Sequence, residues 1–343
     1  MTGPRLVLRA DASHRLGSGH VLRLAALAEA AIDAGGAATL VVGGDPAASL
    51  AVLAERGLPA VAADGTSGGA AEGAATIALA RAHAADAVVV DGPAFTPAYV
   101  AAIAAARLRV VAIDDLGLAP PPAEVVVNHN LGAEALAERY PAAATRLLGR
   151  RYHLLRREFR ALPAGGAPPR GRVERLLITM GGSDPAGATP RVLGALPPGA
   201  LAVTVVLGPG FRADRALAAG LAAAERAGHR VAVTYQPRDL AALMAGCDLA
   251  ISAAGGTLAE LAYLGRPTVA IAIAPDQVAN ARRHADAGLA AGGWPLAAVD
   301  DRELAATIAA LVGDPLARRA LAAAATAATD GQGAARVVAH LAA

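Results

Sequence analysis

The chain has 343 residues, enough for about two domains of ordinary size, and a formal net charge of only +2. It contains no lysine, which excludes both a Walker-type phosphate loop and a Schiff base to pyridoxal phosphate. Aromatic residues make up 3% of the chain and its arginines are scattered, so we expect no nucleic-acid partner.

The sequence gives no sign of a metal centre, a bound cofactor or a membrane segment. Cys247 is the single cysteine and the eight histidines lack metal-binding spacing, so we predict no metal and no cofactor, and place Cys247 in the core. Proline and glycine interrupt uncharged stretches such as 196–211, and residues 1–8 do not resemble a leader. We therefore expect a cytoplasmic protein without stable membrane insertion, and the oligomeric state stays open.

In the first half of the chain, short apolar runs alternate with alanine-rich helical segments. This alternation predicts a mainly parallel sheet covered on both faces, with the ligand crevice at the carboxyl ends of its strands. The predicted strands lie at 6–8, 39–42, 59–62, 87–90, 109–113 and 124–127. Polar or glycine residues follow them, namely Asp11, Gly43-Gly44, Asp91-Gly92, Asp114-Asp115 and Asn128-His129-Asn130.

The loop after the first strand carries the main candidate for catalysis. Gly17 and Gly19 allow a sharp turn, and the apolar spacing from Val21 onward predicts a helix that begins beside the crevice. His20 lies at this helix start, where an imidazole that titrates near neutral pH can act as general acid or base beside an anion-binding loop. The alternative is a polar residue that only caps the helix.

The second half repeats the alternation after a break in composition. Residues 161–172 are rich in proline, glycine and alanine and are predicted to be a linker between domains at 1–160 and 173–330. Further strands are predicted at 175–179, 202–207, 231–234, 249–252 and 268–273. The sequence thus predicts two doubly wound α/β domains that face each other across a cleft, with a terminal helix at 331–343 packing back across the hinge.

Two glycine-containing loops of the second half are candidate phosphate sites. In both, small residues end a strand and precede a helix, so that backbone amides can approach a ligand. The carboxylate of Glu260, one turn inside the second of these helices, can accept from a ribose diol. The alternative is that Glu260 only complements the helix dipole and that the glycines only close a turn. The candidate residues are Gly181, Gly182, Ser183, Ser252, Gly255, Gly256 and Thr257.

Two amides follow the last predicted strand. Gln277 and Asn280 are three residues apart, hence on one helical face, and can point at one ligand together. The alternative is helix capping and surface solvation. We favour ligand contact because the stretch follows a strand on the presumed cleft side.

Taken together, these motifs resemble those of the GT-B superfamily of UDP-sugar enzymes. The resemblance is carried by RADASHRLGSGHVLR (9–23), VAIDDLG (111–117), GGSD (181–184), ISAAGGTLAELAYLGRP (251–267) and DQVANARRH (276–284). Within the superfamily, the chain looks most like the hydrolases of pseudaminic acid biosynthesis, which act on UDP-2,4-diacetamido-2,4,6-trideoxy-β-L-altropyranose. Spore-coat polysaccharide glycosyltransferase-like proteins share the pattern, which extends from Arg9 to about Arg336.

The resemblance implies a metal-independent hydrolase that releases UDP and a free modified sugar. It implies that Gly255, Gly256 and Thr257 hold the phosphates and that Glu260 lies near the ribose, with Gly181, Gly182 and Ser183 at the border of the nucleotide site. His20 matches the histidine implicated in activating water. Asp11 and Arg23 are implied to support or bind the sugar, and Gly17, Gly19 and Asp91 belong to the same substrate side.

One position departs from the hydrolase pattern. Those enzymes carry Asp-x-Tyr after the strand at 87–90, whereas this chain reads Asp91-Gly92-Pro93, so Phe95 or Tyr99 is expected to fill part of the space. Two other functions stay open beside hydrolysis. One is a GT-B glycosyltransferase that moves the sugar to an acceptor, as the UDP-GlcNAc transferase of peptidoglycan lipid synthesis does. The other is a non-catalytic UDP-sugar-binding protein.

Overall fold

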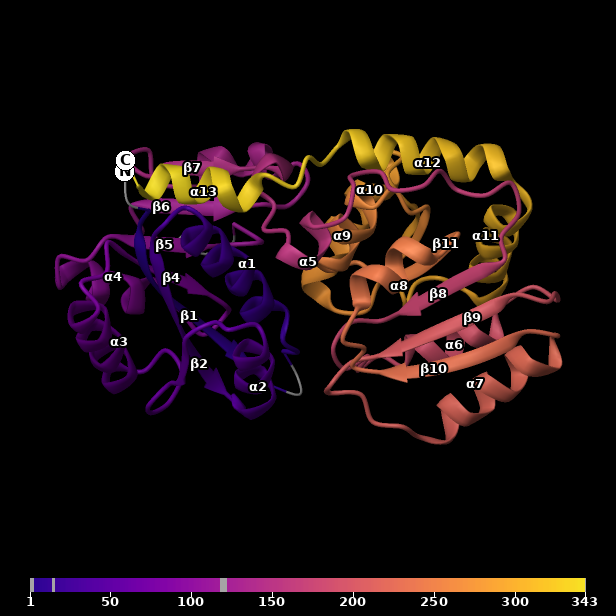
Figure 1. Cartoon of the computed structure of the whole chain (residues 1–343), viewed down its shortest axis with the longest axis horizontal. Helices are drawn as coiled ribbons and strands as arrows, with labels where there is room; N and C mark the ends of the chain where they lie inside the picture. The colour runs from indigo at the N-terminus through magenta and orange to yellow at the C-terminus, as the bar shows by residue number, and fades with distance from the viewer. Residues whose placement is uncertain (1–2, 14–15, 118–121, 343) are drawn as a thin grey trace. The chain divides into compact units, whose positions relative to one another are not determined.

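The chain divides into two compact units, each built around its own parallel sheet. The structure, a computed structural model, describes residues 3–13, 16–117 and 122–342. The first unit comprises Met1–Arg157 and Gly331–Ala343, and the second comprises Glu158–Asp330. The terminal segment that was expected to pack back across the hinge therefore belongs to the first unit (Figure 1). His14, Arg15 and Ala343, which fall within predicted segments, lie outside the described residues.

The first unit contains a seven-stranded parallel sheet in the order β3-β2-β1-β4-β5-β6-β7. Its strands are β1 (Arg5–Ala12), β2 (Ala37–Gly44), β3 (Ala60–Ala62), β4 (Ala87–Asp91), β5 (Val110–Ile113), β6 (Val125–Asn128) and β7 (Thr145–Leu148). Its helices are α1 (Gly19–Asp33), α2 (Ala47–Glu55), α3 (Ala70–Ala82), α4 (Pro97–Ala105), α13 (Gly333–Leu341) and the 3₁₀ helices η1 (Ala133–Arg139) and η2 (Arg150–Tyr152).

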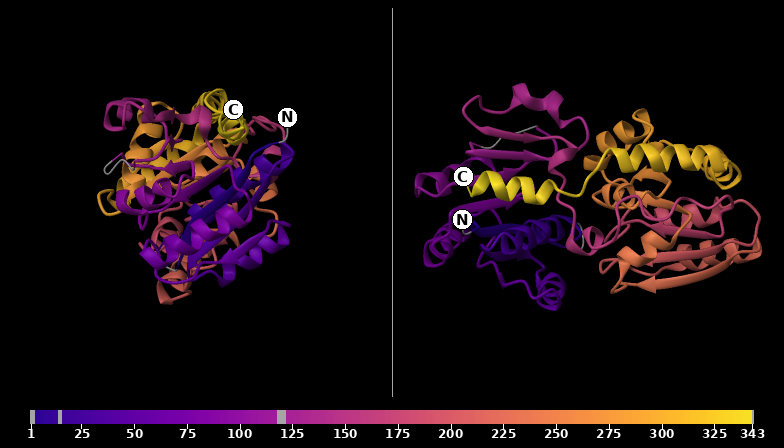
Figure 2. Two further views of the ribbon diagram at one scale, coloured as in Figure 1. Left: turned by 90° about the vertical axis from the view of Figure 1, so that its left-hand side faces the viewer. Right: turned by 45° about the horizontal axis from the view of Figure 1, so that its top comes forward.

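The two faces of the first sheet pack against different helices. Side chains alternate along β1, so Leu8 and Ala10 join a core with α1 and α13, whereas Val7 joins a core with α3 and α4. The predicted apolar face of α1, including Val21 and Leu24, is buried in the first of these cores. Figure 1 shows α1 on one side of this sheet and α3 with α4 on the other, and both views of Figure 2 place α13 against the first unit.

The second unit contains a six-stranded parallel sheet in the order β10-β9-β8-β11-β12-β13. Its strands are β8 (Arg175–Thr179), β9 (Ala202–Leu207), β10 (Arg230–Tyr235), β11 (Leu249–Ala253), β12 (Thr268–Ala272) and β13 (Ala291–Pro295). Its helices are α5 (Arg157–Arg160), which begins at the last residue of the first unit, α6 (Ala188–Gly194), α7 (Arg215–Arg226), α8 (Leu240–Gly246), α9 (Thr257–Tyr263), η3 (Pro275–Gln277), α10 (Val278–Asp286), α11 (Asp301–Gly313) and α12 (Pro315–Ala327).

Both doubly wound sheets confirm the predicted fold class, and the predicted strands all correspond to observed ones. Two strands at sheet edges, β7 and β13, were not predicted from the sequence. Residues 161–172, which we expected to link two domains, lack helix and strand and belong to the second unit. Buried arginines hold this segment, because Arg266 donates to the Ala167 carbonyl and Arg318 to the carbonyls of Arg170 and Gly171.

The described residues include no helix long and apolar enough to cross a membrane, and no group of three or more metal-binding side chains. Cys247 is 3% exposed and its thiol donates to the Met244 carbonyl at 3.2 Å, which confirms a core position. Burial raises the pKa of this thiol to about 12, so it is poorly suited to be a nucleophile.

Candidate functional site

Each sheet reverses its strand order beside its first strand, between β1 and β4 in the first unit and between β8 and β11 in the second. In open α/β sheets, ligands bind outside the carboxyl ends of the strands at such a switch point. The residues that follow β1, β4, β8 and β11 are therefore the first place to look for function in each unit.

The turn after β1 places His20 and Arg23 on one face of α1. Gly17 has a φ of +70°, a conformation that favours glycine, and its amide donates to the Ser13 carbonyl at 2.8 Å. Gly19 is the first residue of α1 and has open space where a side chain would lie. His20 and Arg23 are three residues apart and therefore neighbours on one face of α1.

His20 contacts a fully buried carboxylate. Asp91 is the last residue of β4, is aligned with Ala10 of β1, and so points to the sheet face covered by α1. The His20 Nδ1 atom lies 2.9 Å from Asp91 Oδ1. Because an ionised carboxylate can only accept, Nδ1 carries the proton, and in the neutral ring Nε2 keeps its lone pair.

The same contact sets the charges of both partners. Burial alone would lower the pKa of His20, but the charge and hydrogen bond of Asp91 outweigh it and raise that pKa above its ordinary value. Burial alone would raise the pKa of Asp91, but Arg23 and His20 lower it. Asp91 is therefore an anion at neutral pH, and His20 is a stronger base than a free imidazole.

Arg23 lies between two carboxylates. Its Nε and Nη2 atoms donate to Asp91 at 2.5 Å each, and its Nη1 and Nη2 atoms donate to Asp115 at 2.9 and 2.7 Å. Asp115 follows β5, is 23% exposed, and also accepts from the side-chain amide of Asn130 at 3.0 Å. Arg23 holds the pKa of the Asp115 carboxyl well below its usual range, although burial alone would raise that pKa.

A second histidine closes the cluster from β6. The Nε2 atom of His129 lies 3.2 Å from Arg23 Nη1, and the ring stacks on His153 with centroids 4.4 Å apart. Burial and the charge of Arg23 lower the pKa of His129 to about 4, so the ring is neutral. A neutral imidazole has one acceptor nitrogen, so the Arg23 contact and the 3.4 Å approach of the Leu154 amide to Nδ1 are alternatives.

Asp11 belongs to a different network on the opposite face of the first sheet. It pairs at 2.7 Å with Arg9, which is fully buried and also pairs with Glu72 at 2.8 Å. The Tyr99 hydroxyl donates to Glu72 at 3.1 Å, and the Phe95 ring lies 4.9 Å from the Arg9 guanidinium. The two aromatic residues expected to replace the missing tyrosine thus belong to the Arg9 network.

In the second unit, the loop after β8 contains Gly181, Gly182 and Ser183. Gly181 has a φ of +72°, and Asp184 accepts from the amides of Ala188 and Thr189 at 2.8 and 2.7 Å, which anchors the loop to α6. A side chain on Gly208, at the end of β9, would lie 2.5 Å from the Gly182 Cα atom. The two strand ends are therefore in close backbone contact, and Gly181 remains exposed.

In the loop after β11, Gly255 is half-buried and Gly256 is exposed, and the loop leads into α9 at Thr257. The first amides of a helix lack intrahelical partners and can bind an anion. Glu260 is 7% exposed in the first turn of α9. Ser252 is fully buried, and its hydroxyl donates to the Ala253 carbonyl at 3.0 Å instead of facing this loop's surface.

Asn280 is hydrogen-bonded to this second loop, and Gln277 lies beside it. The Asn280 side-chain amide donates to the Ala254 carbonyl at 2.8 Å, and the Gln277 side-chain carbonyl accepts from the Ile273 amide at 3.1 Å. The Nε2 atom of Gln277 lies 3.7 Å from the position of a side chain on Gly255. Its amide nitrogen therefore lies beside the glycine loop, as the prediction of a shared ligand contact requires, although both side chains also have structural partners.

The structure thus brings together His20, Arg23 and Asp91 in the first unit and places Asp11 apart from them. Asp115, His129 and Asn130 follow predicted strands, and Asp115 also lies in the motif VAIDDLG, but the sequence analysis gives none of them a part in the site. The signal that identifies them is position alone, since they follow β5 and β6, the parallel strands next to β4.

The comparisons with known proteins agree with this architecture. No family model and no curated protein sequence matches the chain. Solved structures do match it over nearly its whole length. MurG of Acinetobacter baumannii has a TM-score of 0.67 at 18% identity, covering 98% of this chain and 99% of the other. The chain has the GT-B fold.

Two further structures with this fold are similar to the chain. A putative UDP-N-acetylglucosamine 2-epimerase from Listeria monocytogenes has a TM-score of 0.66 at 16% identity, covering 99% of this chain and 96% of the other. Anabaena Alr3699/HepE, crystallised in complex with UDP, has a TM-score of 0.63 at 18% identity, covering 99% of both chains. At these identities the GT-B similarity establishes the fold, and the activity is argued from the residues.

Proposed function

We propose that the chain hydrolyses a UDP-linked modified sugar without a metal ion, releasing UDP and the free sugar, with His20 as the general base. The single observation that carries the proposal is the contact between His20 and Asp91. It leaves the Nε2 lone pair of a partly exposed imidazole, 20% accessible, as the proton acceptor. A general base with this orientation can remove a proton from water as the water attacks the anomeric carbon.

The second unit offers the groups that a UDP leaving group needs. Cleavage of the bond between sugar and phosphate places negative charge on the departing diphosphate, which backbone amides can stabilise. The glycines at 181–182 and 255–256 are exposed or half-buried and have no side chains, so such a group can approach the backbone closely. The proposal assigns the diphosphate to these loops and the ribose diol to Glu260.

Several observations support a nucleotide-sugar substrate. The motifs of the chain resemble those of UDP-sugar hydrolases, and UDP or UDP-sugar names occur among the structures that share the fold. The same base can also deprotonate an acceptor hydroxyl, so transfer to an acceptor is the second candidate. What separates the two functions is whether UDP appears when water is the only acceptor.

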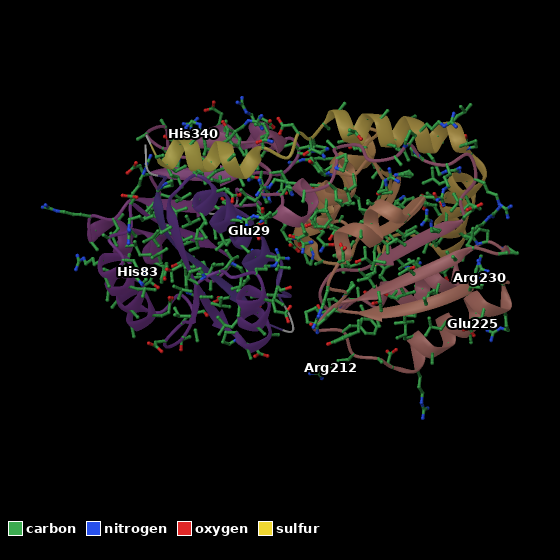
Figure 3. All side chains as sticks on the ribbon, viewed as in Figure 1. Glu29, His83, Arg212, Glu225, Arg230 and His340 are labelled. Carbon is green, nitrogen blue, oxygen red and sulfur yellow. The ribbon has the colours of Figure 1, made fainter. Side chains whose placement is uncertain are left out.

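The experiment measures UDP release from UDP-2,4-diacetamido-2,4,6-trideoxy-β-L-altropyranose, with chelator and without added acceptor, for the wild type and His20→Ala. We expect the variant to lose roughly 10²- to 10⁴-fold in turnover, the usual contribution of a general base, and to retain UDP binding by calorimetry. The matched control is His83→Ala, because His83 is exposed (Figure 3) and its carbonyl accepts from Arg5 at the start of β1, whereas His20 follows the other end of that strand.

Each other outcome contradicts part of the proposal. Saturable UDP binding without turnover refutes hydrolysis of this substrate. If turnover then appears only when an acceptor is added, the chain is a transferase. Turnover that survives His20→Ala at the rate of the His83→Ala control removes His20 from the mechanism.

A further inference from the structure

The cluster around His20 contains more charge than one base and its orienting carboxylate require. Arg23 and Asp115 form a second ion pair at 2.7 Å, and neither the sequence motifs nor the hydrolysis proposal gives Asp115 a task. Both side chains are only partly exposed, 15% for Arg23 and 23% for Asp115, so their charges are incompletely screened by water.

Arg23 has two opposite effects on His20: it supports the orientation of the ring and disfavours its protonation. Through its bonds to Asp91 it fixes the carboxylate that holds His20 Nδ1. Its own Nη2 atom, however, lies 3.1 Å from that Nδ1, which already carries a proton, so the guanidinium charge acts directly against protonation of the ring. An arginine in this position on its own would make His20 a poor base.

Asp115 compensates for that charge. With both imidazoles neutral, one guanidinium and two carboxylates give the cluster a single net negative charge, which becomes zero when His20 takes up a proton. If Asp115 is made neutral, the same proton uptake takes the cluster from zero to a net positive charge, which is unfavourable in a partly buried site.

We propose that Asp115 is a positioning residue that keeps His20 basic by neutralising Arg23 and holding its guanidinium against Asp91. Among the described residues, the charged or titratable groups around His20 are Arg23 on α1, Asp91 on β4, Asp115 after β5 and His129 after β6. Asp115 acts on His20 through Arg23, from which it accepts two hydrogen bonds. The inference rests on the proposed role of His20 as base, and it concerns the proton affinity of His20 rather than the identity of the substrate.

The test follows protonation of His20 directly, by NMR titration of its ring Cε1–H signal in the full chain, assigned by its loss in His20→Ala. We expect Asp115→Asn to weaken proton binding at His20 roughly threefold or more, because the charge that is removed lies in a partly buried site where water screens it incompletely. Asp115→Glu keeps the charge and is expected to restore the wild-type midpoint. In Asp115→Asn, the rise of kcat/KM on the acid side of the pH profile is expected to move to lower pH together with the NMR midpoint of His20.

The neighbouring carboxylate provides a matched control. Asp114 accepts from the Leu116 and Gly117 amides at 3.0 and 2.9 Å, whereas the Arg23 guanidinium donates to Asp91 and Asp115, so Asp114→Asn is expected to leave the His20 midpoint unchanged. Equal midpoints in Asp115→Asn and Asp114→Asn would overturn the inference. If Asp115→Asn shifts the midpoint but the wild-type chain releases no UDP, the proposed function is refuted and the role of Asp115 stays intact.

Discussion

Replacement of Asp91 by asparagine keeps His20 but changes the group that orients its ring, so it tests the orientation alone. In the wild type, one oxygen of Asp91 accepts from His20 and both accept from Arg23. An asparagine amide offers only one acceptor oxygen, and its nitrogen is a donor. If the amide oxygen faces His20, its nitrogen opposes the Arg23 Nε donor. If the nitrogen faces His20, Nδ1 must accept, the proton moves to Nε2, and the base is lost.

The magnitude follows from these contacts. Asp91 is fully buried, and a hydrogen bond to a charged group contributes about 1.5–3 kcal/mol, but Arg23 keeps its bonds to Asp115. We therefore expect Asp91→Asn to lose about 2–4 kcal/mol in free energy of unfolding, which lowers Tm by about 2–4 °C per kcal/mol. Turnover is expected to fall roughly 10²- to 10⁴-fold, as after removal of the base itself.

The assay combines UDP release between pH 5 and 9 with thermal unfolding. For the wild type, kcat/KM is expected to rise with pH through the pKa of His20, above its ordinary value, because the neutral ring is the active form. In Asp91→Asn, the remaining activity is expected to reach its plateau at lower pH. Asp33→Asn, an exposed change at the end of α1, is the control and is expected to unfold within about 0.5 kcal/mol of the wild type. An Asp91→Asn enzyme that works within threefold of the wild type would refute the orienting role of Asp91.

Two further predictions concern stability. In Gly208→Ala, the new methyl group would clash with the backbone of Gly182, so we expect the free energy of unfolding to fall by about 1–3 kcal/mol and UDP binding to weaken. Gly194→Ala is the control: no atom lies near its new side chain, and we expect its free energy of unfolding to rise by up to about 1 kcal/mol. Thermal unfolding and UDP titration check the pair, and equal Tm values would contradict the packing argument. The second concerns His129, whose pKa falls to about 4 on folding from an ordinary 6.5, so the unfolded chain binds the proton first and stability is lost as pH falls through this window. In His129→Gln, we expect the free energy of unfolding, measured with urea, to fall less between pH 6.5 and 4 than in the wild type. If this free energy falls equally with pH in both proteins, His129 is not neutral in the folded state.

The sequence predicts the buried strands because each is a nearly uninterrupted apolar run, as in Ala87–Asp91 and Thr268–Ala272. The two missed strands lack that signal. In β7, Thr145 is exposed and Arg146 is half-buried, so only two residues of the strand form an apolar run. In β13, Gly292 and Gly293 have φ values of +83° and +90°, and the register with β12 shifts beside them, so neither composition nor alternation indicates a strand.

The candidate site was predictable in part for a similar reason. His20 could be found because a glycine turn and a helix start are local features. The contacts of Asp91 with His20 and Arg23 span 71 and 68 residues, and those of Arg23 with Asp115 span 92. Such pairs depend on strand order, which the sequence alone does not determine. Asp11 shows the converse, since the alternation of side chains along β1 takes it to the opposite face from Asp91.

The helix α13 has a consequence for how the protein forms during synthesis. Its residues Ala334, Val337, Val338 and Leu341 complete the same core as α1, and the start of the helix packs so closely on His153 that a side chain on Gly333 would lie 2.2 Å from the His153 carbonyl. The ribosome makes these residues only after the whole of the second unit. The first unit is therefore translated first but completed last. Until α13 has been synthesised, the surface of α1 that it covers remains exposed.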